Sequence, residues 1–369
     1  MLAVLLLSLV AAGATAVRYP TSVTTYNGGK TAESGELIFE DNFDELNLET
    51  WQHELTLRGG GNWEFEGYNN NRTNSFVRDG ILFVKPTLTA ERFSNDYLYS
   101  GVLDMNGDNP FDQCTSPLNF GCSRQGSQAD ILNPIMSASL RTALSFTFTY
   151  GRVEVRAKMP AGDWIWPAIW MKPKMEPYGN WPTSGEIDIL ESRGNGDLSV
   201  GGTQIGNQQV SSTLHWGPDF ASNRYQLTHF ETNNAAGFNA DFHVYKMEWS
   251  PEGIKFSVDD TALGEVTPPA GGFWELGGFN KDTWRNNPWQ GRSKMAPFDQ
   301  PFYLKLNVAV GGTNSFFPDA AVNGAGAKPW SNTSPTAPKD FWEGNGQWLP
   351  TWQGDDVAMQ VDYVRVYAI

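Results

Sequence analysis

The chain has 369 residues, of which 41 are Asp or Glu and 26 are Lys or Arg, so its formal net charge is −15. Nucleic-acid binding depends on clustered cations that release counterions from phosphates, so this acidic balance excludes an electrostatic nucleic-acid binder. Aromatic residues make up 13% of the chain and charged residues only 18%, which excludes a disordered acidic protein. We therefore expect a folded protein with a large core.

The first 16 residues, MLAVLLLSLVAAGATA, form an apolar run that ends on Ala14 and Ala16 in an A-x-A arrangement. This pattern predicts a cleaved secretory signal peptide at 1–16 and a secreted mature chain that begins at Val17. A membrane anchor is the alternative, but the run is short, and no later stretch approaches the ~20 apolar residues of a span. We expect no membrane partner.

Two cysteines, Cys114 and Cys122, lie eight positions apart in a turn-rich segment. In an oxidising secretory compartment this spacing predicts one local disulfide, and the absence of a nearby histidine argues against a metal site there. Two N-x-[ST] sequons, at Asn71 and Asn332, are candidate glycan acceptors.

Short segments with alternating side chains recur along the chain, separated by Gly, Asn, Asp and Pro clusters. In residues 145–150 every second side chain is aromatic, residues 254–258 alternate in the same way, and residues 359–367 carry apolar side chains on both faces. No amphipathic helix longer than two turns is evident. The pattern predicts an all-β sandwich or barrel and disfavours a parallel α/β fold.

No repeat or biased linker divides the mature chain, so we predict a single domain at 17–369. A domain of this size is large for a sandwich, which implies long insertions. The best candidates are residues 89–140, 267–300 and 312–355, the last two of which hold most of the late tryptophans.

The segment WPTSGEIDILESRGN places three carboxylates, Glu186, Asp188 and Glu191, among residues that favour strands. Residues two apart share a face of a strand, so Glu186 and Asp188 project together, whereas Glu191 has the opposite parity. A β-bulge near Ile189 and Leu190 would return Glu191 to the same face, and bulges are common beside active sites. The alternative is that the three carboxylates only form a solvated face of a strand.

With the bulge, the Cα atoms of Glu186 and Glu191 are expected to be roughly 13 Å apart at about 3.3 Å per residue. Their side chains then leave the two carboxyl groups about 5–6 Å apart, which is near the spacing of a retaining glycosidase. Asp188 between them can hydrogen-bond to one glutamate, while repulsion raises the proton affinity of the other.

Aromatic residues precede this cluster in GRVEVRAKMPAGDWIWPAIWMKP, where Trp164, Trp166 and Trp170 have the same parity. Flat rings beside carboxylates suit the apolar faces of sugar rings, and an apolar wall supports the raised pKa of an acid. Packing in the core is the alternative for each ring, and the sequence leaves it open.

Seven ordered blocks together resemble glycoside hydrolase family 16: GRVEVRAKMP, WPAIW, GEIDILE, TLHWG, FHVYKMEWSPEGIKFSVDD, NVAVGG and VDYVRVY. The similarity runs from about residue 36 to the C-terminus. The spacing ExDxxE resembles the β-1,3-glucanase (laminarinase) branch, whereas other branches often have the shorter ExDxE. Within the family the chain is most similar to secreted endo-β-1,3-glucanases of molluscs and other invertebrates.

The resemblance implies a β-jelly-roll sandwich of the concanavalin A-like type, with a cleft across its concave sheet. It also implies that Glu186 is the nucleophile, Glu191 the general acid/base, and Asp188 the residue that assists the nucleophile. No cofactor is expected for catalysis.

Five further residues are implied as substrate contacts. Trp166 and Trp170 would stack on sugar rings, His215 would lie near the acid/base, and Asn307 and Asn62 would contact the substrate. Asn62 lies in GGGNWEFE, which resembles the family segment GGGNNELQ. Trp63 replaces an Asn of that segment, so sugar recognition on that side can differ.

Many members of the family carry a structural calcium ion on the convex face. The resemblance places such a site at Asp362 of the VDY block, with carbonyl groups near Gly80 and an acid such as Glu40 as further ligands. The alternative is that Asp362 is only an exposed carboxylate on a strand.

The leading hypothesis is endo-hydrolysis of internal β-1,3-glucosidic bonds in laminarin-type glucans with retention, and transglycosylation when a sugar replaces water. A non-catalytic β-1,3-glucan recognition protein of innate immunity is the alternative from another class. Such relatives commonly lack the catalytic glutamates and carry an extra N-terminal domain, whereas here only about twenty residues separate the signal from the first block. Mixed-linkage β-1,3-1,4-glucan is an alternative substrate, and we expect a monomer.

Overall fold

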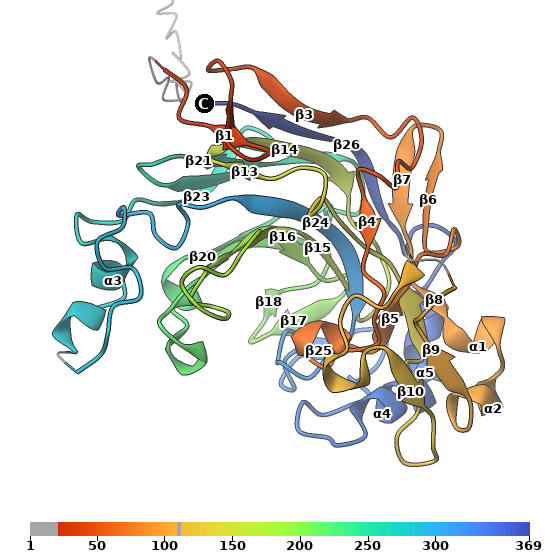
Figure 1. The fold of residues 1–369 in the computed structure, drawn as a ribbon. Helices are drawn as coiled ribbons and strands as arrows, with labels where there is room; N and C mark the ends of the chain where they lie inside the picture. The colour runs from red at the N-terminus through yellow and green to blue at the C-terminus, as the bar shows by residue number, and fades with distance from the viewer. Residues whose placement is uncertain (1–20, 109–111, 283) are drawn as a thin grey trace, which may run out of the picture.

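The protein is described by a computed structural model over residues 21–108, 112–282 and 284–369, so the predicted signal peptide lies outside the described residues. Two large antiparallel sheets pack face to face (Figure 1). This architecture confirms the predicted all-β, jelly-roll-like sandwich.

The first sheet, called the site sheet below, carries the carboxylate cluster on β16. Its strands in spatial order are β2 (Lys30–Thr31), β1 (Thr25–Tyr26), β13 (Phe148–Thr149), β24 (Phe302–Val310), β15 (Ile165–Pro173), β16 (Glu186–Ser192), β19 (Gln209–His215) and β20 (His229–Asn233), with β12 (Ser139–Arg141) paired to β24 and β4 (Gln52–His53) paired to β12.

The second sheet, called the outer sheet, covers the other face of the site sheet. Its strands in order are β23 (Thr261–Val266), β22 (Ile254–Val258), β21 (His243–Trp249), β14 (Gly151–Lys158), β26 (Met359–Tyr367), β7 (Ile81–Val84) and β6 (Ser75–Arg78), with β3 (Leu37–Asp41) paired to β26.

Three small sheets and short helices complete the described chain. The sheets are β5 (Glu66–Tyr68), β11 (Ile135–Ser137) and β8 (Thr87–Leu88); β9 (Val102–Asp104) and β10 (Ser123–Gln125); and β17 (Leu198–Val200), β18 (Thr203–Gln204) and β25 (Val322–Asn323). The helices are α1 (Thr89–Arg92), α2 (Asn95–Leu98), α3 (Gly272–Leu276), α4 (Ala337–Glu343) and α5 (Asn345–Trp348), with 3₁₀ turns at Gly59–Gly61, Leu118–Phe120, Phe220–Ser222, Tyr225–Leu227, Phe279–Lys281 and Leu349–Thr351. Within the described residues, no helix has the length and apolarity to cross a membrane.

The main core lies between the two large sheets and follows from alternation along their strands. On β14, Val153, Val155 and Ala157 are fully buried, and the residues between them are half-buried on the opposite face. Each of the two valine side chains stabilises the fold by about 1.5–3 kcal/mol when it leaves water. The burial of one face per strand therefore fixes which side chains of β16 can face the site.

Two strand predictions need correction. The strand predicted at 145–150 is reduced to β13. At its start, the N–H groups of Ser145 and Phe146 donate to the carbonyl of Thr142 in a turn, and at its end Tyr150 has a φ of 62°, which breaks the extended backbone before β14 begins. The strand β26 has the predicted bounds but buries mainly one face: Val361, Val364 and Val366 are fully buried, whereas the side chains between them are half-buried.

The insertions predicted at 89–140 and 312–355 pack against each other beside the site sheet (Figure 1). Leu98 and Leu132 of the first insertion share a second hydrophobic core with Trp342 and Trp348 of the second. The indole of Trp342 also donates a hydrogen bond to Asn95 across this contact, at 2.9 Å. Several of the late tryptophans therefore serve this second core.

Candidate active site

A β-bulge in β16 places the three carboxylates on one face. Asp188 lies opposite Thr213 and Glu191 lies opposite Ser211 of β19. Between these two pairs β16 advances by three residues, whereas β19 advances by two. Both residues between them, Ile189 and Leu190, are buried in the main core. The predicted bulge is therefore present, whereas the distance between the carboxyl groups stays a prediction.

Glu191 is held in an environment that favours its protonated form. Burial raises the pKa of Glu191 to about 7, and the nearby charge of Glu186 adds to this effect. A hydrogen bond of 3.0 Å from the indole Nε1 of Trp166 and the charge of Arg193 oppose it. A carboxyl group with a pKa near 7 can both give and take a proton at neutral pH, as a general acid/base must.

Trp166 is covered on one face by Phe316, a residue that the sequence reasoning missed. The two rings are stacked with their centroids 3.8 Å apart, and the guanidinium of Arg193 lies 4.0 Å from the centroid of Phe316. Only 7% of Trp166 is exposed. Sugar stacking on Trp166 stays a prediction and concerns the face that Phe316 leaves uncovered.

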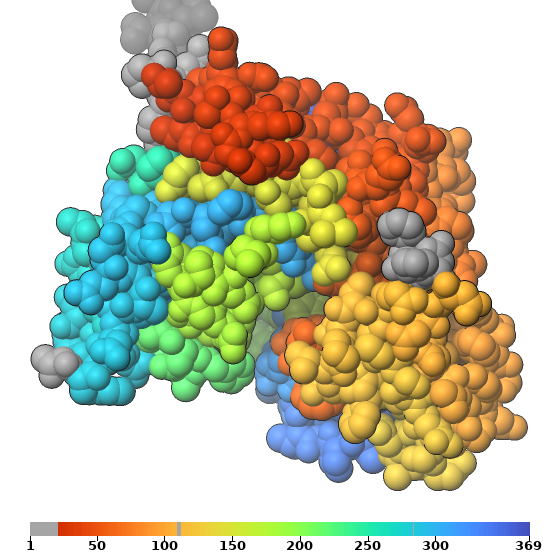
Figure 2. All heavy atoms as spheres, viewed as in Figure 1, coloured from red at the N-terminus to blue at the C-terminus, as the bar shows by residue number. Residues whose placement is uncertain are grey.

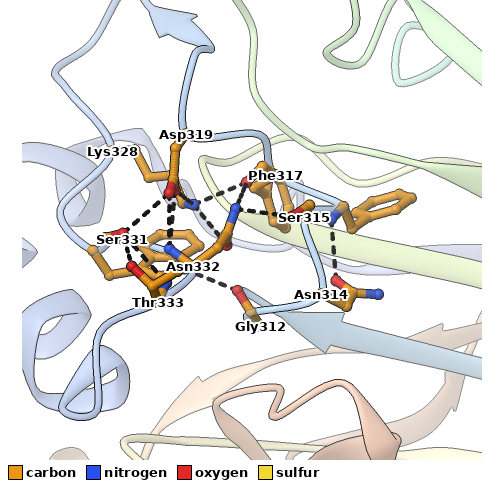
Figure 3. Close-up of polar contacts among 11 residues, drawn as sticks. Gly312, Asn314, Ser315, Phe317, Asp319, Lys328, Ser331, Asn332 and Thr333 are labelled. Carbon is orange, nitrogen blue, oxygen red and sulfur yellow. Dashed lines mark hydrogen bonds and ion pairs between the residues drawn. The ribbon is translucent and has the colours of Figure 1, made fainter.

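A buried lysine holds the loop that carries Phe316 (Figure 3). The Nζ of Lys328 lies 2.6 Å from Asp319 Oδ1, 2.8 Å from Asn332 Oδ1 and 2.9 Å from the carbonyl oxygen of Phe317. The side-chain amide of Asn332 donates to the same carbonyl at 3.0 Å. We call Asp319, Lys328 and Asn332 the latch; it fixes the backbone next to Phe316.

Trp164 packs in the hydrophobic core, which was the alternative to a role in sugar stacking. It is 1% exposed and makes edge contacts with Phe317 and Trp330 in the second core. Its φ of 68° lies in the left-handed region, so the alternation that suggested a shared face with Trp166 does not extend back to it.

The indole of Trp170 contacts two buried polar side chains, those of Asn307 and Lys305. Its indole Nε1 donates to Asn307 Oδ1 at 2.6 Å, and the amide of Asn307 donates to the hydroxyl of Tyr68 at 3.0 Å. The ammonium of Lys305, paired with Glu54, lies 4.2 Å from the centroid of the Trp170 indole. Both ends of the Asn307 side chain are thus engaged within the protein, and its role as a substrate contact stays a prediction.

Asn62 is connected to the site by a hydrogen bond to a buried glutamate, Glu64. Its amide donates to Glu64 Oε1 at 2.8 Å, and burial raises the pKa values of Glu64 and Glu66. A Cβ atom at Gly60 would lie 2.3 Å from the carboxylate oxygens of Glu64, so the glycine-rich turn makes room for this acid. The charge of Glu64 also raises the pKa of Glu191 slightly. The contact of Asn62 with substrate stays a prediction.

His215 lies on the Glu186 side of the cluster and not beside Glu191, as the resemblance had implied. It is the cross-strand partner of Glu186, and its Nε2 lies 3.3 Å from Asp188 Oδ2. The imidazole packs between Trp181 and Tyr225, with ring centroids 5.5 and 5.2 Å away. Burial lowers the pKa of His215, so the ring is neutral at neutral pH.

Glu186, Asp188 and His215 bring one ligand atom each within 4.8 Å of one another, close enough for a metal ion. A histidine that binds a metal usually donates a hydrogen bond from its other ring nitrogen. Here Nδ1 of His215 lies 2.8 Å from the side-chain nitrogen of Asn223, which is a donor. The ring is therefore not arranged as a metal ligand.

The calcium site implied at Asp362, Glu40 and Gly80 stays a prediction. Asp362 is ion-paired with Arg156, and Glu40 lies 2.8 Å from Arg365. A calcium ion bound by these carboxylates would compete with both guanidinium groups.

The predicted disulfide between Cys114 and Cys122 is present. The two sequons differ in their surroundings. Asn71 Oδ1 accepts hydrogen bonds from the backbone and hydroxyl of Thr73, at 2.9 and 3.1 Å, whereas the amide of Asn332 donates within the latch. Glycosylation of either residue stays a prediction.

Figure 2 shows the surface hollowed between the green part of the site sheet and the orange and yellow lobe built from the first insertion. The strand β16, which carries the three carboxylates, belongs to this sheet. This hollow gives a long polymer a route to the sheet that carries the carboxylates.

The chain is similar both to glycosyl hydrolases and to proteins named for β-1,3-glucan binding. Residues 115–274 match the model of glycosyl hydrolases family 16. The chain is 54% identical to the β-1,3-glucan-binding protein of Penaeus monodon, with 90% of each chain covered. It is 36% identical to β-1,3-glucan-binding protein 1 of Manduca sexta over 91% of this chain, and spans 65% of that relative's length. The laminarinase structure from Rhodothermus marinus aligns with a TM-score of 0.57 and 26% identity, covering 91% of this chain and 98% of the other.

Proposed function

The chain belongs to family 16 of the glycosyl hydrolases, and on this premise we propose that it is a retaining endo-β-1,3-glucanase acting on laminarin-type glucans. The observation that carries the proposal is the pair formed by Glu186 and Glu191. The bulge puts both on one face, and burial holds the pKa of Glu191 at about 7. A binding protein has no need of a carboxyl group poised to exchange a proton at neutral pH.

In the first step a carboxylate oxygen of Glu186 attacks the anomeric carbon, and the bond to the leaving sugar oxygen breaks as Glu191 gives that oxygen its proton. In the second step Glu191 takes a proton from water, the water oxygen attacks the same carbon, and Glu186 leaves. Two inversions give net retention. When a sugar hydroxyl replaces water, the same intermediate yields transglycosylation.

The test compares the wild type with Glu186→Gln on laminarin, following reducing ends. Removing the nucleophile should lower turnover about a thousandfold or more, while binding to laminarin persists. Glu49→Gln, the same change at an exposed site, is the matched control and should keep wild-type turnover. Equal turnover by Glu186→Gln and the wild type would contradict the proposal.

Non-catalytic recognition of β-1,3-glucan is the second candidate, and the names of the relatives from Penaeus monodon and Manduca sexta favour it. Binding of laminarin by the wild type with no reducing ends released would select this candidate. Parallel assays on lichenan test the mixed-linkage alternative, because a mixed-linkage enzyme would release reducing ends faster from lichenan than from laminarin.

We also propose that the chain acts outside the cell as a monomer. The disulfide between Cys114 and Cys122 supports the location, because such bonds persist in oxidising compartments. N-terminal sequencing of the secreted protein should begin at Val17, and light scattering should give the mass of one chain.

A further inference from the structure

The side chain of Asn223 has only one favourable orientation. Its Oδ1 faces two backbone N–H groups, those of Trp216 at 3.3 Å and Tyr225 at 3.2 Å. An amide turned by 180° would direct its own NH₂ group at these two donors, which is unfavourable. The NH₂ group of Asn223 must therefore face the other way, toward His215.

The orientation of Asn223 in turn determines which nitrogen of His215 carries the proton. The NH₂ group lies 2.8 Å from Nδ1 of His215, and it can only donate. Nδ1 must accept this hydrogen bond through its lone pair, so a neutral ring carries its proton on Nε2. Nε2 is the nitrogen that lies 3.3 Å from Asp188 Oδ2.

Asp188 depends on this contact. It is 5% exposed, and within the described residues its Oδ2 has no hydrogen bond of normal geometry. Nε2 of His215 lies 3.3 Å from this oxygen, and the charge of Lys172 also favours the ionised carboxyl group. Burial and the charges of Glu186 and Glu191 raise the pKa of Asp188 well above its usual range, so its ionised form needs a donor. If the proton of His215 were on Nδ1, Nε2 would present a lone pair to Oδ2 instead of an N–H group. Leaving a buried acceptor without a donor is costly.

The loop that carries Asn223 is firmly held. Arg285 binds Asp219 at 2.6 Å and the hydroxyl of Ser222 at 2.7 Å, on the residues that precede Asn223. The indole of the neighbouring Trp216 is fully buried and donates to Thr228. Asn223 thus meets the requirement for a supporting residue, since its own rotamer is fixed by its surroundings.

We propose that Asn223 is a positioning residue that keeps the proton of His215 on Nε2, where the ring supports Asp188 and, through it, the nucleophile Glu186. Its role in turnover rests on the function proposed above. The charged and titratable groups around the ring are Glu186 and Asp188 on β16, His229 on β20 and Tyr225 in the Asn223 loop.

Asn223→Asp tests the proposal by replacing one NH₂ group with an oxygen. One carboxylate oxygen can still accept from the backbone, but the other now faces Nδ1 as an acceptor. Nitrogen-15 NMR of the histidine rings should show His215 neutral with its proton on Nε2 in the wild type at pH 7. In the variant it should show both nitrogens protonated, and kcat on laminarin should fall about tenfold with little change in KM.

Asn287→Asp is the matched control, because the Oδ1 of Asn287 also accepts from a backbone N–H two residues on, that of Trp289. It should leave the His215 spectrum unchanged. If Asn223→Asp does not fold, Asn223→Ala replaces it and should populate the form with the proton on Nδ1.

A wild-type ring protonated on Nδ1, or a His215 spectrum that is the same in the wild type and in the Asn223 variant, would overturn the proposal. The NMR result does not depend on turnover. A wild type that shows the expected spectrum but releases no sugar would therefore count against the proposed function alone.

Discussion

Glu186 and Glu191 stand at opposite ends of the same bulged segment, and the protein supports them in different ways. On the Glu191 side, stacked aromatic rings exclude water, and the pKa of the carboxyl group rises to about 7. On the Glu186 side, polar groups are lined up one behind another, from the Asn223 loop through His215 to Asp188.

The difference matches the two tasks in the proposed mechanism. A general acid/base must hold and release a proton, which burial under an apolar cover promotes. A nucleophile must stay ionised and correctly aimed, which oriented N–H groups promote. The predictions below test whether each device serves its own side only.

Among the changes that test this comparison, Glu191→Gln should have the largest effect. Loss of the general acid/base should lower turnover about 10²–10⁴-fold. In the wild type the rate should fall as the pH rises through about 7, because Glu191 then loses the proton that it must donate.

The same variant should have a higher free energy of unfolding than the wild type above pH 7. The folded pKa of Glu191 is about 7 and its ordinary value 4.5, so between these values only the unfolded chain releases the proton, and rising pH destabilises the fold. Glutamine avoids this cost, which is about 3 kcal/mol at most. The melting temperature of Glu191→Gln should exceed that of the wild type at pH 8 and equal it at pH 4; equal values at pH 8 would show that Glu191 is not buried as described.

A smaller effect is expected from Phe316→Ala. Removing the ring exposes one face of Trp166, admits water toward Glu191 and moves the pKa of Glu191 back toward its ordinary value. The alkaline limb of the pH-rate profile should shift to lower pH, and the rate at pH 7 should fall about tenfold.

Phe220→Ala is the control for Phe316→Ala, because it removes an aromatic ring on the Glu186 side instead of the Glu191 side. Phe220 is 77% exposed and contacts Trp181 on the Glu186 side. This variant should leave the alkaline limb in place whatever it does to the rate. A shift of the limb in Phe220→Ala as large as that in Phe316→Ala would mean that the two sides are not independent.

The smallest effect concerns the two sequons. Asn332 donates its amide within the latch on the Glu191 side, whereas no such bond engages the amide of Asn71 within the described residues. We expect glycan at Asn71 and little at Asn332 in protein secreted from insect cells, as measured by mass spectrometry of peptides. Equal occupancy would show that the latch forms without the Asn332 amide.

The sequence was sufficient to predict the features that depend on short spacing. Parity along a strand identified the odd position of Glu191 and required a bulge, which is present. Apolar alternation predicted β22 at Ile254–Val258 with its correct bounds, and the turn-rich spacing of Cys114 and Cys122 predicted their disulfide.

The features that the sequence did not reveal depend on contacts between distant segments. Phe316 covers Trp166 from 150 positions away, and nothing periodic near residue 316 indicates it. Asn223 is closer to His215, but its role follows from the direction of an amide group in a loop, which side-chain patterns do not encode. The second core was hidden for the same reason, since it joins aliphatic residues of the insertion at 89–140 to tryptophans of the insertion at 312–355.

The bulge also changes how this segment should be compared between proteins. In a regular strand the third acid on the face of Glu186 and Asp188 would occupy position 190; here Ile189 and Leu190 both turn inward, and the acid appears at 191. ExDxE and ExDxxE thus place the same three acids on one face of a strand, and they differ by the one residue that the bulge inserts. A residue-by-residue alignment without a gap would pair a catalytic glutamate with a core leucine, so the two motifs should be matched by strand face and not by position number.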